Sequence, residues 1–132
     1  MKLSMMIILG LAGAEGSERH ALATAKAINI IKPTHLSALC LMLYRGSELL
    51  EQYEAGKFNP LSPAGLMREL KLIIENIDLP ADRHCLFRSN HVSNYVQLAA
   101  TLPHDKQRLL RDIDYSIAQL SKLKSWDVYN YN

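Results

Sequence analysis

The sequence predicts an α/β fold in which helices flank an open, mostly parallel sheet. Two apolar runs, Ser4–Leu11 and Leu36–Leu43, are nearly continuous, as in strands buried on both faces. Each run ends in a glycine turn and leads into a pattern with helical spacing. Strands that alternate with helices pair in parallel through right-handed crossovers. The chain has 132 residues, 48% of them hydrophobic, which is enough for one domain with a core.

The first strand is followed by a predicted helix that starts near Ser17. Ser17 is a suitable N-cap, and Glu18 favours the positive end of the helix. Pro33 stops the helical pattern. The apolar positions on one helical face are Leu22, Ala25, Ile28 and Ile31.

The second strand is followed by the turn Arg45-Gly46-Ser47 and a short helix that ends near Gly56. The segment Asn59-Pro60-Leu61-Ser62-Pro63 then predicts a break and a new helix, with Ser62 as N-cap and Pro63 at the first helical position. One face of this helix is apolar: Leu66, Leu70, Ile73, Ile74 and Ile77.

The last third of the chain predicts a short strand, His84–Phe87, and a long helix, Pro103–Leu123. The end of the chain, with Tyr129-Asn130-Tyr131-Asn132, has the character of a frayed tail. We therefore expect one α/β domain over residues 1–125 and a tail over 126–132.

The number of strand-helix units limits the architecture. Each unit takes about 30 residues and a closed eight-unit barrel about 250, so this chain suffices for a partial (half) TIM-like barrel or an open sheet. Such a sheet exposes strand edges and one apolar face, which proteins normally cover. We expect a homo-oligomer or a missing N-terminal half as partner.

Charge and cysteine content exclude several classes. The 15 basic and 13 acidic residues leave a formal charge of +2 without a basic cluster, which argues against nucleic-acid binding. No apolar run reaches the ~20 residues of a membrane span. Cys40 and Cys85 lie in separate apolar runs, which favours buried thiols and a cytoplasmic location over a disulfide.

The amino terminus also imitates a secretion signal. Lys2, the apolar run Met5–Leu11 and Ala12-Gly13-Ala14 correspond to the charged, apolar and cleavage regions of such a peptide. The run passes directly into a helix start at Ser17, however, and this favours a retained strand.

The glycine turn after the first strand is a candidate ligand site. Gly10, Gly13 and Gly16 resemble a dinucleotide fingerprint, but the first interval is wrong and no acidic residue lies near Ile30. The glycines have a second explanation, a tight turn between strand and helix. Backbone amides at Ser17–Arg19 remain candidates for binding an anion.

The predicted loop after the third strand holds the densest set of polar side chains. Arg88-Ser89-Asn90-His91 is followed closely by Asn94 and Tyr95. Either Arg88 binds an anion while His91 exchanges protons, or the asparagines shape a turn. The five histidines show no paired spacing, so we expect no intrinsic metal site. Arg45-Gly46-Ser47 likewise lacks the Gly-x-Ser-x-Gly elbow of hydrolases.

The order of these segments resembles the second half of a radical SAM barrel. The resemblance covers roughly residues 5–117, and the last two of the segments named below look like a bacterial subgroup described as iron-sulfur oxidoreductases of unassigned substrate. The segments that carry it are Ile7-Ile8-Leu9-Gly10-Leu11-Ala12-Gly13, Tyr44-Arg45-Gly46-Ser47, Phe58-Asn59-Pro60-Leu61-Ser62-Pro63, Phe87-Arg88-Ser89-Asn90-His91-Val92-Ser93-Asn94-Tyr95 and Thr101-Leu102-Pro103-His104-Asp105-Lys106.

The resemblance implies an activity that this chain does not carry alone. Radical SAM enzymes bind a four-iron (4Fe-4S) cluster on a Cys-x-x-x-Cys-x-x-Cys loop and use it to cleave S-adenosylmethionine, and that triplet is absent from this sequence. By resemblance, Ile8, Gly10 and Gly13 line the adenine-contacting strand. The fuller family pattern Gly-x-Ile-x-Gly-x-x-Glu fails, because Met6 stands at its first position and Gly13 at its last.

Further site residues follow from the resemblance. Arg88, Asn90, His91 and Asn94 are candidates on the substrate side of the barrel. We therefore expect the C-terminal part of a radical SAM oxidoreductase, inactive by itself.

Two alternatives remain open. One is a stand-alone α/β binding or interaction domain that self-associates through its sheet. The other is a metal-free small-molecule enzyme that uses Arg88 and His91.

Overall fold

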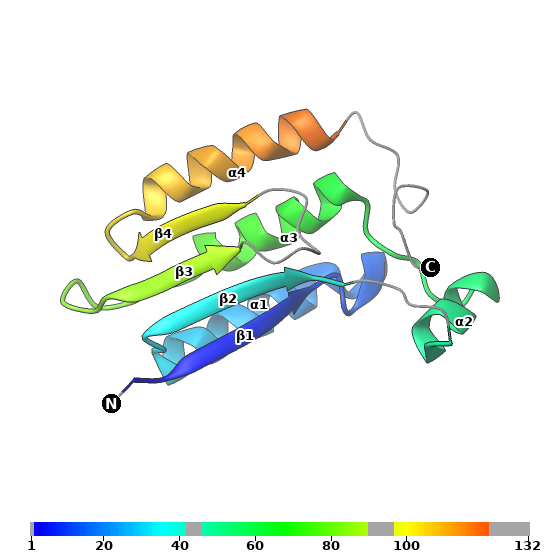
Figure 1. Cartoon of the computed structure of the whole chain (residues 1–132), viewed down its shortest axis with the longest axis horizontal. Coiled ribbons are helices and arrows are strands. Elements are labelled where there is room, and N and C mark those ends of the chain that lie inside the picture. Colours follow the sequence, from blue (N-terminus) through cyan, green and yellow to red (C-terminus); the bar gives the residue numbers. More distant parts are fainter. Residues whose placement is uncertain (1, 42–45, 90–96, 122–132) are drawn as a thin grey trace.

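The computed structural model describes residues 2–41, 46–89 and 97–121, which form an α/β fold (Figure 1). In chain order the elements are β1 Ser4–Leu9, α1 Gly13–Ile31, β2 His35–Cys40, α2 Glu48–Glu54, α3 Pro63–Glu75, β3 Cys85–Ser89, β4 Leu98–Leu102 and α4 Lys106–Leu120.

The four strands form one open sheet in the order β1-β2-β3-β4. β1, β2 and β3 are parallel, and β4 is antiparallel to β3. The predicted α/β fold with an open, mostly parallel sheet is therefore confirmed. The sheet is not a closed barrel, because among the described residues β1 and β4 each have a neighbouring strand on one side only.

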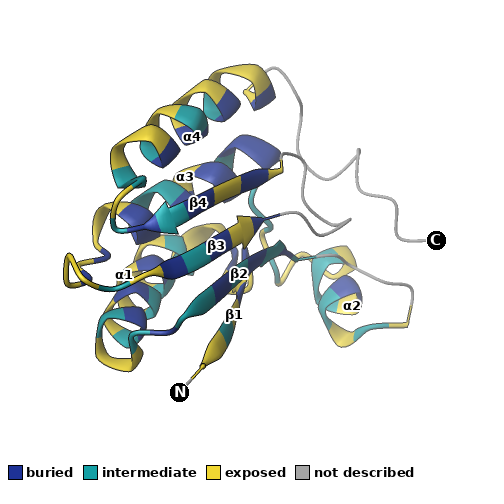
Figure 2. Ribbon diagram, turned by 60° about the vertical axis from the view of Figure 1, so that its left-hand side comes forward, coloured by how far each residue is buried: buried dark blue, intermediate teal, exposed yellow. Residues whose placement is uncertain are grey.

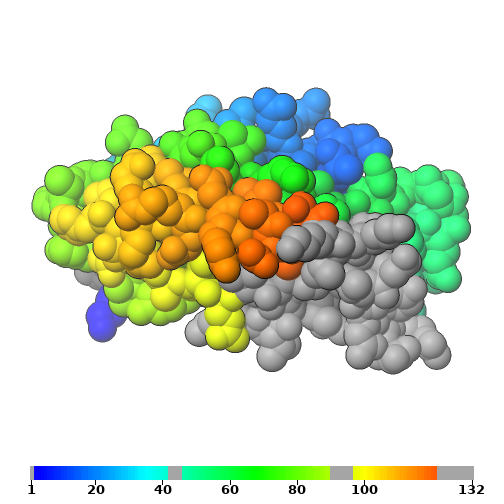
Figure 3. Space-filling model, turned by 90° about the horizontal axis from the view of Figure 1, so that it is seen from above, coloured from blue at the N-terminus to red at the C-terminus, as the bar shows by residue number. Residues whose placement is uncertain are grey.

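The helices α1, α3 and α4 lie on one side of the sheet (Figures 1 and 2). Viewed from above, α3 lies between α4 and α1, so the three helices form a continuous layer (Figure 3). The strands bury every second residue against this layer. The buried strand residues are Ile7, Leu9, Leu36, Ala38, Cys40, Cys85, Phe87, Ser89, Leu98, Ala100 and Leu102.

The sequence prediction of strands buried on both faces is wrong. Met6 is 67% exposed and Ile8 39% exposed, although both are apolar and flank the buried Ile7 of β1. The run is continuous because both faces carry apolar residues, but the helices of the described residues cover only one face. No helix within the described residues is long and apolar enough to cross a membrane.

Several predicted element bounds need correction. β1 ends at Leu9 instead of Leu11, because Gly10 turns the chain with a φ of +86°. The described part of β2 is His35–Cys40 instead of Leu36–Leu43, and β3 is Cys85–Ser89 instead of His84–Phe87. α4 is shorter than the predicted Pro103–Leu123, and β4 was not predicted at all.

The start of α1 also differs from the prediction. The helix begins at Gly13 and not after Ser17, so the amides of Ser17–Arg19 lie inside the helix, where they cannot form an anion site. The first amides are already used: Gly13 N–H donates to the Gly10 carbonyl (3.0 Å) and Ala14 N–H to the Asn59 carbonyl (2.7 Å).

Other helix ends agree with the prediction. The hydroxyl of Ser62 accepts from Gly65 N–H at 3.0 Å, and Pro63 is the first residue of α3. Ser47, which was predicted only as part of the turn before this helix, caps α2 by accepting from Leu50 N–H at 3.2 Å. α1 ends with Lys32 in the left-handed region, directly before Pro33.

The outer edge of β4 is covered by groups from the start of α4. The Asp105 carboxylate accepts from Thr101 N–H (2.9 Å), and Asp105 N–H donates to the Thr101 carbonyl (2.8 Å). Arg108 donates to the Ala99 carbonyl at 3.0 Å. These contacts occupy most of the outward backbone groups of the strand.

Asp105 should make the stability depend on pH in the acid range. The Thr101 amide, assisted by Arg108, holds the pKa of the Asp105 carboxyl below its ordinary value of 3.8. A lowered pKa in the folded state adds stability above the ordinary value, and this is lost as the pH falls through the lowered pKa. We expect Asp105→Ala to lower the urea midpoint at pH 7 but not below the lowered pKa. A loss of urea midpoint that is the same at every pH would contradict this prediction. The same pH-dependent loss in Asp82→Ala, which removes an exposed carboxylate, would contradict it too.

Candidate functional site

The carboxyl ends of the parallel strands meet at one edge of the sheet, where ligands of parallel sheets bind. Leu9 and Cys40, the last residues of β1 and β2, are register partners, and β3 runs in the same direction. Helix α2 lies beyond this edge (Figure 1). The carboxyl edge borders the sheet face that the helix layer leaves uncovered.

This uncovered face, here called the open face, consists of three rows of side chains. The strand register gives the rows as Ser4, His35, Leu86 and Thr101; Met6, Ser37, Arg88 and Ala99; and Ile8 and Leu39. All ten residues alternate with the buried strand residues, so they point away from the helices.

Arg88 is the only Asp, Glu, Lys or Arg among these ten described residues. Its neighbours Phe87 and Ser89 are buried, whereas Arg88 is exposed. One guanidinium nitrogen donates to the Phe87 carbonyl at 2.8 Å. A guanidinium binds carboxylate or phosphate groups through paired N–H donors. An open face with one arginine among apolar and uncharged polar side chains therefore suits an anionic ligand with an apolar part.

The predicted adenine-contacting residues do not lie together: Ile8 is on the open face, whereas Gly10 and Gly13 belong to the turn after β1. The Ile8 side chain is on the open face, and the Ile8 carbonyl accepts from Nε2 of His20 at 3.1 Å. Gly10 N–H donates to Oε2 of Glu69 at 2.8 Å. A side chain at Gly13 would lie 3.0 Å from the Asn59 carbonyl oxygen. Thus Ile8 is available to a ligand, whereas the Gly10 amide and the Gly13 backbone shape the turn.

A buried carboxylate that the sequence did not predict as a site residue lies beneath this turn. Glu69 of α3 is only 2% exposed. Its Oε2 accepts from Gly10 N–H and its Oε1 from the hydroxyl of Ser17, both at 2.8 Å. The available signal was its position on the apolar face of α3, three residues after Leu66. The carboxylate connects the turn after β1, the amino-terminal part of α1 and α3.

The remaining predicted site residues cannot be placed. Asn90, His91 and Asn94 lie outside the described residues, as does Tyr95. Of the predicted polar loop, only Arg88 and Ser89 are described, and they belong to β3.

The described residues do not fit an iron-sulfur cluster. No group of three or more His, Cys, Asp or Glu residues in the described ranges could hold a metal ion. Both cysteines are buried and no disulfide joins them, and the register places Cys40 at the carboxyl end of β2 and Cys85 at the opposite end of β3. Burial, partly opposed by Arg83, raises the pKa of the Cys85 thiol, which makes it a poor ligand or nucleophile at neutral pH.

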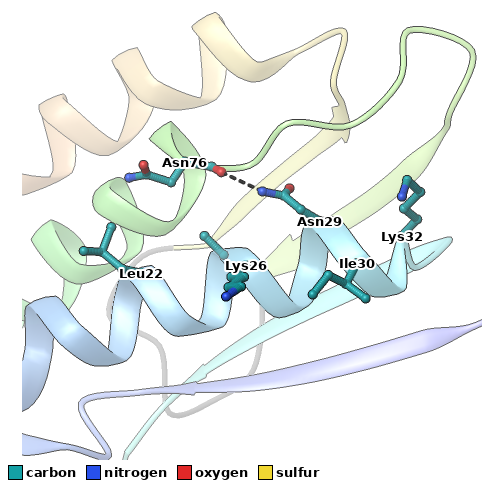
Figure 4. A pocket seen from close by; sticks show the side chains of 7 residues that line it. Leu22, Lys26, Asn29, Ile30, Lys32 and Asn76 are labelled. Atoms are coloured by element: carbon teal, nitrogen blue, oxygen red, sulfur yellow. Dashed lines mark hydrogen bonds between the residues drawn. The ribbon is translucent and has the colours of Figure 1, made fainter.

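A hollow of about 500 Å³, apart from the open face, lies between the carboxyl-terminal half of α1 and the end of α3 (Figure 4). Asn29 donates to the Asn76 carbonyl (2.9 Å) and accepts from Asp78 N–H (2.7 Å). The Asn29 side chain in this hollow thus joins α1 to the segment after α3. We assign this hollow a structural role.

The comparisons with known proteins give no further identification: no family model, no curated protein sequence and no solved structure matches the chain.

Proposed function

We propose that the chain is the carboxyl-terminal part of a radical SAM barrel, in which the open face lines the barrel interior. The observation that supports this is the one-sided helix layer. In a β/α barrel the helices surround the strands, and the other face of each strand points inward, with the site at the carboxyl ends. The open face here has the same relation to α1, α3 and α4.

In this proposal, Ile8 and Arg88 contribute to the ligand site, and neither performs chemistry on the cluster. Ile8 packs against the adenine of S-adenosylmethionine, and Arg88 binds an anionic group of the ligand or substrate. Asn90, His91 and Asn94 extend the substrate side from the segment after β3. The cluster belongs to the other part of the barrel, because the described residues of this chain offer no fitting ligand set.

The first test is anaerobic reconstitution of the chain with iron and sulfide. We expect no stoichiometric four-iron cluster, as judged by iron and sulfide content and by the cluster absorption. The Cys40→Ser variant should behave identically. A stoichiometric cluster that is lost in this variant would contradict the assignment of the cluster to another part of the barrel.

The second test uses co-expression with the cluster-bearing part of a protein from the family that the chain resembles. We expect the two parts to associate and to cleave S-adenosylmethionine to 5′-deoxyadenosine. Arg88→Ala should lower this activity about tenfold or more, as expected for the loss of a charge-assisted hydrogen bond. Arg111→Ala, which removes an exposed arginine of α4, is the matched control. Failure to associate, or equal activity of the two variants, would argue against the proposal.

A second candidate is a stand-alone α/β module that self-associates through its sheet. The observation that favours it is the difference between the two outer strands of the sheet.

A further inference from the structure

The two edge strands of the sheet are protected to different extents. On β4, the side chains and backbone of α4 and its preceding turn occupy the Thr101 N–H, the Thr101 carbonyl and the Ala99 carbonyl. Natural proteins protect edge strands in such ways, because unpaired edge groups are a template for pairing with another chain. β4 is therefore a closed edge.

β1 presents an open edge. The Leu3 and Leu9 carbonyls point toward β2, since they accept from His35 N–H and Leu41 N–H. By alternation, the backbone groups of Ser4, Met6 and Ile8 point outward. Within the described residues, the only hydrogen bond to these outward groups is the one from His20 to the Ile8 carbonyl.

The side chains of β1 add no protection either. No charged residue and no proline occurs from Leu3 to Ala14. Four large apolar residues of this segment are exposed by 39% to 67%: Leu3, Met6, Ile8 and Leu11. Figure 1 shows β1 as the outermost strand, with α1 behind it.

A groove follows the same edge. It has a volume of about 390 Å³ and lies between β1 and α1, with residues of both faces of β1 on one wall. The opposite wall is formed by residues of α1, mainly small ones: His20, Ala23, Thr24 and Ala27. Small side chains on the helix leave room for apolar side chains of a neighbouring molecule.

We infer that β1 pairs with β1 of a second copy of this chain, antiparallel and across a two-fold axis. The charge pattern favours a copy as the occupant: with no charge from Leu3 to Ala14, two identical edges meet without like charges opposite each other. A two-fold axis at Met6 places Met6 opposite Met6 of the second copy, and Ser4 opposite Ile8 of the second copy. In this register the outward backbone groups of one β1 face the outward groups of the other. The two sheets then form one continuous sheet of eight strands.

This inference concerns the chain on its own and does not rest on radical SAM chemistry. The other part of a barrel would occupy the same edge of β1, so it would compete with the second copy. The assembly tests below involve neither a cluster nor Arg88, and their failure is distinguishable from a failure of the proposed function.

The test is the molar mass in solution, measured by light scattering and sedimentation over a wide concentration range. We expect the wild-type chain to be a dimer. Met6→Lys places two like charges next to the axis and should raise the Kd of the dimer at least about tenfold. Ile30→Lys is the matched control: Ile30 is 69% exposed, compared with 67% for Met6, but lies on α1 away from this groove.

A charge-pair experiment separates strand pairing from a general loss of stability. Met6→Glu alone should raise the Kd of the dimer as Met6→Lys does, whereas an equimolar mixture of the Met6→Lys and Met6→Glu proteins should form a tighter heterodimer that weakens as salt is added. A wild-type monomer at high concentration would overturn the inference. A dimer that persists in Met6→Lys, or two charged variants that do not associate on mixing, would overturn it equally.

Discussion

Replacing Glu69 by alanine is expected to lower the free energy of unfolding by about 3 kcal/mol. The carboxylate is 2% exposed and accepts from two donors, Gly10 N–H and the Ser17 hydroxyl. Its removal leaves the buried Gly10 amide without a partner, which costs about 1–3 kcal/mol, and opens a cavity beside the core. The measurement is urea unfolding followed by circular dichroism.

Two variants make this prediction specific. Glu69→Gln should cost less than about 1 kcal/mol, because the amide oxygen still accepts from Gly10 and the Ser17 hydroxyl can accept from the new amide nitrogen. Glu75→Ala removes an exposed glutamate at the end of the same helix and should change stability by less than about 0.5 kcal/mol. If Glu69→Ala is no worse than Glu75→Ala, the carboxylate does not hold the turn.

The elements that the sequence predicted correctly depend on local signals. Ser62 and Pro63 define the start of α3 through contacts within four residues, and Pro33 follows directly on the end of α1. Side chains and backbone restrictions of this kind act wherever the chain is placed. The same holds for Gly10 and Gly13, whose positive φ values form the predicted turn.

The missed features depend on contacts that are distant in the sequence. The start of α1 at Gly13 is held by the Asn59 carbonyl, which accepts from Ala14 N–H. These two residues lie 45 positions apart in the sequence. With that partner unknown, Ser17 was the best local cap, yet its hydroxyl bonds to Glu69 instead. β4 is a weak strand by composition, and it forms because β3 and the start of α4 satisfy both its edges.

The candidate site was predictable only in part, for the same reason. Strand alternation was hidden because Met6 and Ile8 are as apolar as the buried Ile7. The sequence therefore indicated the strand but not its open face. Arg88 was found as the first polar residue after an apolar run, and the register then placed it next to Ser37 and Ala99.

Substituting Gly10 by alanine should lower the free energy of unfolding by about 3 kcal/mol, for two separable reasons. The φ of +86° disfavours any side chain, at about 1–2 kcal/mol. In addition, a Cβ at this position would lie 2.7 Å from Cδ2 of Leu66, a core residue that is 1% exposed and has little room to move. Overpacking of a core typically adds about 1–3 kcal/mol.

The chain itself provides the controls that separate the two costs. Gly46 has a φ of +87° and Gly56 one of +76°, and a Cβ at either would meet nothing within 4 Å. Gly46→Ala and Gly56→Ala should therefore cost only the conformational part, about 1–2 kcal/mol.

The same experiment tests whether the turn after β1 rests on the core. Leu66→Val removes the methyl group that Cβ would meet, at a cost of about 1 kcal/mol by itself. In this background, Gly10→Ala should cost no more than Gly46→Ala does in the wild type, so the double-mutant cycle should give a favourable coupling of about 1–2 kcal/mol. Additive costs would show that Leu66 does not constrain the turn. Coupling would show that Leu66 on α3, the helix that also carries Glu69, constrains the turn at the carboxyl end of β1.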